Sequence, residues 1–118
     1  MEPGELHTKV ETAFNAGDVD ALVALYEPDA QLLGDDGTPA VGLDAIREAW
    51  GGLVGFGGTI AMTTRSVAVS GDTALLSNRS EFTLDGNVAA SAITAEVARR
   101  QADGTWLYVI DNPYAAEG

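Results

Sequence analysis

The C-terminal part of the chain carries ionisable residues whose spacing could support acid–base chemistry. Asp111 follows directly after the apolar run Trp106–Ile110. A carboxyl group held against apolar walls has a raised pKa, and near neutral pH it can act as a general acid or base. The alternative is structural: Asp111 caps the end of a strand and hydrogen-bonds nearby backbone before the turn at Pro113. The sequence leaves both interpretations open.

A pair of charged residues precedes Asp111, in a segment where polar and apolar residues alternate. Arg79 and Glu81 stand two residues apart, so in a strand their side chains share one face. A polar row of this kind either faces solvent or lines a pocket, and in the second case Arg79, Glu81 and Asp111 form one catalytic trio. The opposite face of the segment carries apolar residues, which weighs against the pocket-lining alternative: Leu76, Phe82 and Leu84.

Large side chains expected to meet the interior of the sheet are candidates for the walls of a ligand site. Tyr26 and Trp50 lie on predicted helix faces that should turn inward, and Tyr26 could donate a hydrogen bond to a ligand oxygen. Met62 and Asn112 complete the predicted ligand-binding set. The single histidine, His7, has no acid–nucleophile pair near it in the sequence and is expected at the surface.

Motifs for a metal, a cofactor or a nucleophile are absent from the sequence. There is no cysteine and no Cys/His cluster for zinc, and the turn pair Asp35–Asp36 lacks the spacing of a calcium loop. The glycine-rich stretch 51–58 lacks the Gly-Lys-Ser/Thr ending of a phosphate loop. We therefore expect neither a metal nor a cofactor.

Length and charge narrow the class of protein. A chain of 118 residues fits a single domain, 1–118. A net charge of −12 argues against nucleic acid and anionic membranes as partners. No apolar run reaches the roughly 18 residues of a membrane span, and the acidic start lacks the pattern of a secretory signal. The expected location is cytoplasmic.

Three amphipathic segments predict helices in the N-terminal half. The expected spans are about Pro3–Ala16, a second helix from the N-cap Asp18 through Tyr26 to the stop at Pro28, and about Leu43–Leu53. Between the second and third helices, Ala30–Leu33 is expected to form a short strand.

From residue 59 onward the hydrophobic period changes to two. Short glycine-containing turns separate four predicted strands, which must therefore pair as antiparallel neighbours: Thr59–Val69, Ala74–Leu84, Val88–Gln101 and Thr105–Asp111. Helices first and strands later indicate an α+β domain. Strands of this length must bend on a small core. The prediction is three helices packed on a strongly curved antiparallel sheet, forming a cone whose interior pocket takes a small apolar molecule.

At this point the sequence resembles the nuclear transport factor 2-like superfamily, and within it the SnoaL-like and ketosteroid-isomerase-like small domains. The resemblance spans nearly the whole chain and rests on five motifs: Gly17–Leu22 with Tyr26–Ala30, Val41–Ile46, Ser70–Ala74, Asp103–Trp106 and Val109–Pro113. It implies a cystatin-like α+β cone. It also implies a homodimer formed through the outer face of the sheet. Function varies widely across this superfamily.

The resemblance suggests one specific chemistry. Arg79, Glu81 and Asp111 are similar to the Asp–Arg–Asp arrangement of limonene-type epoxide hydrolases, although Glu81 stands where an aspartate is expected. Leu32 and Gly34 stand near the positions of the polar pair that holds the water in those enzymes. The steroid-isomerase pattern fits less well, because its base falls near Gly34 and Phe14 replaces a hydroxyl-bearing tyrosine.

The sequence thus favours a cofactor-independent acid–base enzyme of the isomerase, cyclase, hydratase or epoxide-hydrolase type, acting on a small apolar metabolite. The alternative is a non-catalytic ligand-binding or dimerisation module of the same fold. A weaker third hypothesis, resting on charge alone, is an accessory protein that a cationic partner recruits through the acidic surface.

Overall fold

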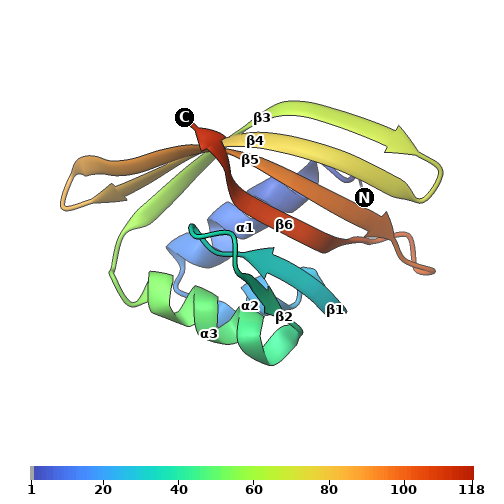
Figure 1. Ribbon diagram of the computed structural model, residues 1–118, viewed down its shortest axis with the longest axis horizontal. Coiled ribbons are helices and arrows are strands. Elements are labelled where there is room, and N and C mark those ends of the chain that lie inside the picture. The colour runs from blue at the N-terminus through green and yellow to red at the C-terminus, as the bar shows by residue number, and fades with distance from the viewer. Residues whose placement is uncertain (1) are drawn as a thin grey trace.

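The first helix forms where the sequence places one continuous apolar stripe. Helix α1 (Glu5–Asn15) buries Leu6, Val10 and Phe14, which recur every four residues. The computed structural model describes residues 2–118 and packs this helix, together with two others, against one side of a curved sheet (Figure 1). Helix α3 (Leu43–Val54) closes the same layer.

The second helix is shorter than predicted. Helix α2 (Val19–Val23) begins at Asp18, whose side chain accepts a hydrogen bond from the backbone N–H of Ala21. Strand β1 (Tyr26–Leu33) then starts at once, so the prediction that Tyr26 lies in a helix was wrong. Pro28 lies in the part of β1 where the pairing with β6 is irregular, between Tyr26 and residue 31. Because no regular hydrogen bonds between the strands form there, the strand can tolerate a residue without a backbone N–H.

One six-stranded sheet forms the other layer. Besides β1 it contains β2 (Pro39–Val41), β3 (Thr59–Ser70), β4 (Thr73–Leu84), β5 (Asn87–Arg100) and β6 (Trp106–Glu117). Their order is β2-β1-β6-β5-β4-β3, and the three hairpins from β3 to β6 are antiparallel, as the short turns predicted. The α+β fold class is confirmed.

The sheet differs from the prediction in the pairing of β1 with β6 and in the length of β6. Strands β1 and β6 pair in parallel, so the sheet is mixed and not purely antiparallel, and it stays open between its edge strands β2 and β3. No short turn constrains β1 and β6, because helix α3 and the four strands β2 to β5 separate them in the sequence. Strand β6 also continues past Asp111 to Glu117, with Pro113 held in an irregularity opposite β5.

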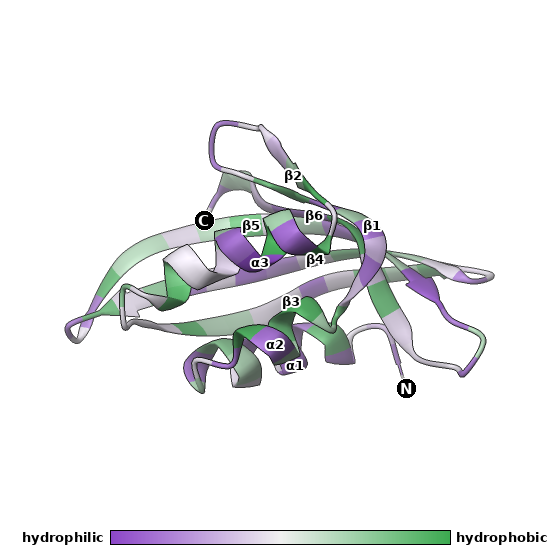
Figure 2. Cartoon of the chain, turned by 90° about the horizontal axis from the view of Figure 1, so that it is seen from below, coloured by the Kyte–Doolittle hydropathy of each residue, from purple (hydrophilic) through white to green (hydrophobic). Residues whose placement is uncertain are grey.

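The core lies between the helical layer and the concave side of the sheet. Figure 2 shows hydrophobic and hydrophilic stretches alternating along the helices, as expected for elements that cover a sheet with one side only. Aromatic rings fill much of this space: Phe14 meets Trp50 edge-on at 5.8 Å between ring centroids, and Phe82 at 6.2 Å. Within residues 2–118, no helix combines the length and apolar character needed to cross a membrane.

Candidate functional site

A cavity of about 550 Å³ lies between the helical layer and the concave face of the sheet. Its walls are mainly apolar and aromatic, and helices α1 and α3 and all six strands contribute to it. Among its lining residues are Val10, Phe14, Leu32, Trp50, Ile60, Met62, Phe82, Tyr108 and Tyr114. The few polar side chains of the lining include two carboxyl groups on neighbouring strands, Glu96 and Asp111.

Asp111 lies in the middle of β6 and lines the cavity with only 6% of its surface exposed. The structural alternative, a cap at the end of the last strand, is therefore wrong. Burial among apolar side chains raises the pKa of the Asp111 carboxyl to about 6, because the charged form loses its hydration. A group with that pKa is largely ionised at neutral pH and can still take up a proton.

A relay of two hydrogen bonds holds this carboxylate. The Tyr26 hydroxyl donates to Asp111 Oδ2 at 2.5 Å, and Trp50 Nε1 donates to the Tyr26 oxygen at 3.1 Å. Burial and the negative charge of Asp111 raise the pKa of Tyr26, so the phenol stays protonated as a donor. The Tyr26 bond opposes the effect of burial on the pKa of Asp111. Tyr26 therefore positions Asp111. The sequence predicts that its hydroxyl donates to a ligand oxygen, but the structure directs this hydroxyl to Asp111 instead.

Glu96 is the functional candidate that sequence reasoning missed. It faces Asp111 directly across the β5–β6 pair and is 2% exposed. Its Oε1 accepts a hydrogen bond from Asn78 Nδ2 at 3.0 Å. Burial and the nearby charge of Asp111 raise the pKa of Glu96 to about 8, against the opposing effect of hydrogen bonds from Thr94 and Asn78.

A signal for Glu96 was present in the sequence. Strand β5 alternates, and its buried positions are Thr94, Glu96 and Ala98. An acidic residue at an inward position of a strand is rarely fully buried without a partner. The period of two therefore places Glu96 on one face with Thr94 and Ala98, but it does not show that this face turns inward.

The two carboxyl groups act as one titrating pair. Cross-strand neighbours have Cβ atoms about 5 Å apart, so in an apolar cavity both cannot be ionised cheaply. The raised pKa of both Glu96 and Asp111 means that near pH 7 the pair holds about one proton. One site thus contains a proton donor and a proton acceptor at the same time, the arrangement that general acid–base catalysis needs.

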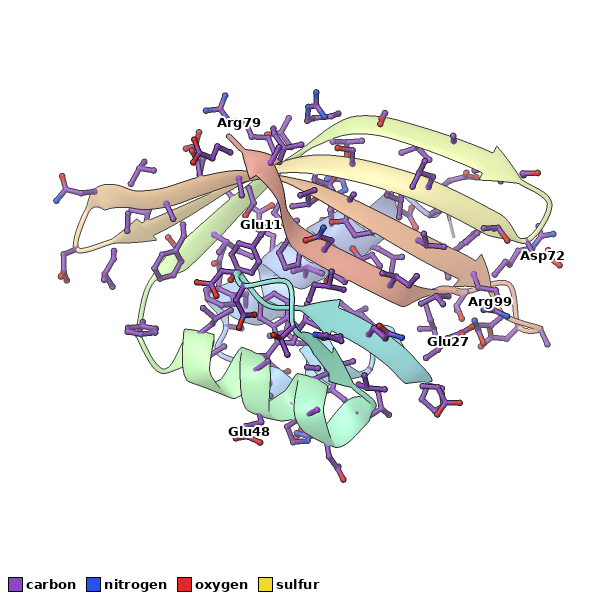
Figure 3. The ribbon with its side chains drawn as sticks, viewed as in Figure 1. Glu11, Glu27, Glu48, Asp72, Arg79 and Arg99 are labelled. Atoms are coloured by element: carbon purple, nitrogen blue, oxygen red, sulfur yellow. The ribbon has the colours of Figure 1, made fainter. Side chains whose placement is uncertain are left out.

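Arg79 and Glu81 lie on the other face of the sheet. They form an ion pair at 3.6 Å with side chains 52% and 42% exposed, and neither lines the cavity. Figure 3 shows Arg79 pointing away from the helical layer. The inward positions of β4 belong to residues such as Asn78 and Phe82. The structure therefore does not assemble the predicted trio: only Asp111 of the three borders the cavity.

Of the remaining residues predicted to bind a ligand, two line the cavity and one lies on the outer face of the sheet. Trp50 and Met62 line the cavity. Asn112 does not, and its side chain accepts a hydrogen bond from the backbone N–H of Tyr114 at 3.1 Å. Asn112 follows Asp111 in β6, so the alternation of the strand turns it to the outer face.

Comparison with known proteins identifies the family to which this chain belongs. The chain matches the model of the SnoaL-like domain over residues 8–114 and therefore belongs to the SnoaL-like family. No curated protein matches the chain.

Several solved structures share the fold. A ketosteroid isomerase-like protein from Erwinia carotovora atroseptica is 26% identical, with 92% of this chain and 89% of that chain covered and a TM-score of 0.71. A proposed dehydratase of the nuclear transport factor 2-like family from Streptomyces avermitilis is 21% identical, with coverages of 96% and 94% and a TM-score of 0.77. A domain with a cystatin-like fold from Nostoc punctiforme is 16% identical, with coverages of 96% and 74% and a TM-score of 0.83.

Proposed function

We propose that this protein is a cofactor-independent acid–base enzyme that transfers protons to and from a small, largely apolar molecule held in the cavity. The observation that carries the proposal is the buried pair of Asp111 and Glu96 at the wall of an apolar, aromatic hollow. Asp111 would act as the base and Glu96, protonated at neutral pH, as the acid. Isomerisation, ring closure and hydration or dehydration all need this combination.

The geometry supports isomerisation, ring closure and dehydration better than hydration or epoxide opening, because the last two reactions need a positioned water. Leu32 of β1 pairs with Asp111 and lines the cavity, so an apolar side chain stands where a water-holding residue would be needed. Arg79 is on the outer face and cannot orient both acids. A base that acts on a carbon-bound proton needs no positioned water, only a substrate pressed against Asp111 by the cavity walls.

Proton abstraction can be tested without knowing the natural substrate. The exchange of α-protons for deuterium in a panel of small cyclic and aromatic ketones, followed by proton NMR in D2O, would report the base directly. We expect exchange above the buffer rate for at least one ketone, a loss of about 100-fold or more in Asp111→Asn, and no loss in the outer-face control Arg79→Met. Equal rates in wild type and Asp111→Asn would overturn the assignment of the base.

A separate titration tests the site itself. Carbon-detected NMR of the side-chain carboxyl groups should show Asp111 and Glu96 titrating above the ordinary range for Asp and Glu. If Asp111 titrates near 3.9 the acid–base proposal fails, and the non-catalytic binding module becomes the better account.

A homodimer through the outer face of the sheet is a second proposal, with an observation of its own. Leu75, Val97 and Ile110 are direct cross-strand neighbours on that face, and Leu75 and Ile110 are 58% and 42% exposed. An exposed apolar row of this kind favours pairing with a second copy. Sedimentation should show a dimer that Leu75→Glu dissociates; a monomeric wild type at micromolar concentration would contradict it.

A further inference from the structure

The charges that line the cavity are unbalanced. Among the described residues, its lining includes Asp35, Glu96 and Asp111 but no lysine, arginine or histidine. The arginines are engaged elsewhere: four form ion pairs with acidic residues, and Arg65 donates to the Ser77 hydroxyl. A negative charge in a desolvated site is normally met by a positive one, and here the protein supplies none.

Two polar atoms at the carboxyl pair also lack a partner within the protein. Asp111 accepts its hydrogen bond at Oδ2, which leaves Oδ1 without a donor, and the Tyr108 hydroxyl has no hydrogen bond within residues 2–118. Both residues are more than nine-tenths buried and both line the cavity. Since no fully enclosed side-chain N or O in the described part of the chain lacks a partner, these two atoms must border the cavity space.

The walls around these atoms suit a cation attached to an apolar body. Phe14, Trp50, Phe82 and Tyr108 present aromatic rings to the cavity, and ring faces attract organic cations, most strongly where water is excluded. A metal ion would need a cluster of ligands, and the described residues contain no group of three or more acidic or histidine side chains placed to hold one. The net charge of −12 would draw small cations towards the molecule.

From these observations we propose that the cavity binds a small organic monocation, with its ammonium group beside Asp111 and Glu96 and its apolar body against the aromatic walls. When Asp111 and Glu96 share one proton, the pair carries one negative charge, which a single positive charge on the ligand would balance. The proton on Glu96 then stays available for transfer. This inference rests on the proposed function, since it names the substrate class of the same site. It differs from the expectation of an uncharged apolar ligand.

The charge requirement can be isolated with two probes of the same shape. Benzyltrimethylammonium and neopentylbenzene differ by a nitrogen cation in place of a carbon, and the quaternary charge does not change with pH. We expect wild-type protein at pH 8 to bind the cation at least about tenfold more tightly than the hydrocarbon, measured by calorimetry and by NMR shifts of the cavity residues. Cation affinity should fall from pH 8 to pH 5, as the carboxyl pair becomes protonated, while hydrocarbon affinity stays constant.

The other titratable groups facing the pair are Tyr26, Tyr108, Tyr114 and Asp35. The tyrosines stay neutral across this pH range because their pKa values are raised, so the fall in affinity would report the carboxyl pair. Glu96→Gln should weaken this pH dependence, because it removes the group that titrates at the higher pH.

Charge variants on the two faces separate a specific site from general attraction. Asp111→Asn should abolish the preference for the cation while leaving hydrocarbon binding intact, which also shows that the variant is folded. Glu81→Gln removes one negative charge from the outer face and should keep the preference. Equal affinity for both probes in wild type, or equal losses in the two variants, would overturn this inference. If such a result came with Asp111-dependent deuterium exchange, the proposed enzyme would stand. Failure of both probes to bind would also overturn this inference, and the enzyme proposal would then depend on the deuterium-exchange test alone.

Discussion

The sheet carries acidic side chains on both faces, and the same chemical group behaves differently on each. On the concave face, Asp111 and Glu96 are almost fully buried and have no cation near them in the cavity lining, so burial raises the pKa of both. On the convex face, Glu81 is 42% exposed and paired with Arg79. Only the buried carboxyl groups are suited to acid–base chemistry, because loss of hydration shifts their pKa values. The exposed ion pair is already stabilised by water and by the opposite charge.

The largest difference between the two faces should appear in how the free energy of unfolding depends on pH. A folded-state pKa raised to about 8 for Glu96, from 4.5, means that the folded state holds more protons than the unfolded state, so stability falls as the pH rises from about 5 to 8. Glu96→Gln removes this cost and should raise the unfolding free energy at pH 8 by about 2–4 kcal/mol, with little change at pH 4.

Urea unfolding followed by circular dichroism at both pH values would measure this effect. Glu81→Gln is the matched control, because it removes the same charge from the exposed face and should change stability by less than about 0.5 kcal/mol. Similar gains in the two variants would mean that general charge repulsion, and not burial at the cavity, destabilises the protein at high pH.

A smaller effect should distinguish the two carboxyl groups within the cavity. In the wild-type protein, the hydrogen bond from the Tyr26 hydroxyl lowers the pKa of the Asp111 carboxyl. Tyr26→Phe removes this bond, so the pKa of Asp111 should rise. The variant also leaves Trp50 Nε1 without its acceptor and should lose about 1–2 kcal/mol of stability.

Carbon-detected NMR titration would measure the shift, with Tyr114→Phe as the control. Tyr114 lines the same cavity and has no hydrogen bond to Asp111, so its phenol can be removed without touching the relay. A pKa of Asp111 that falls in Tyr26→Phe, or moves as much in Tyr114→Phe, would contradict the proposed role of Tyr26.

The hydrophobic periods of the sequence predict most of the fold. The stripe of Leu6, Val10 and Phe14 predicted the first helix, and the glycine turns predicted the three hairpins, although the last strand runs past the predicted end at Asp111 to Glu117. The errors lie where tertiary pairing outweighs local preference. Strand β1 begins at Tyr26 because it pairs with β6 from the far end of the chain, and no local pattern reports such a contact.

The candidate site was predictable only in part, for a related reason. Asp111 stood out because it follows an apolar run, and its burial can be argued from sequence. Arg79 and Glu81 were misplaced because alternation shows which residues share a face but not which face turns inward. Glu96 was missed because its importance comes from lying opposite Asp111, a register that depends on irregularities in the β5–β6 pairing.

The smallest predicted effect concerns the convex face. In a double-mutant cycle, Arg79→Met and Glu81→Gln should show a coupling of no more than about 0.5 kcal/mol, because both side chains are half exposed and 3.6 Å apart. The cycle should be measured by urea unfolding in a Leu75→Glu background, where the proposed outer-face dimer cannot form. A coupling above about 1 kcal/mol in the parent protein, lost in that background, would mean that a second copy buries the pair. A strong coupling in the Leu75→Glu background itself would contradict the exposure on which the contrast between the two faces depends.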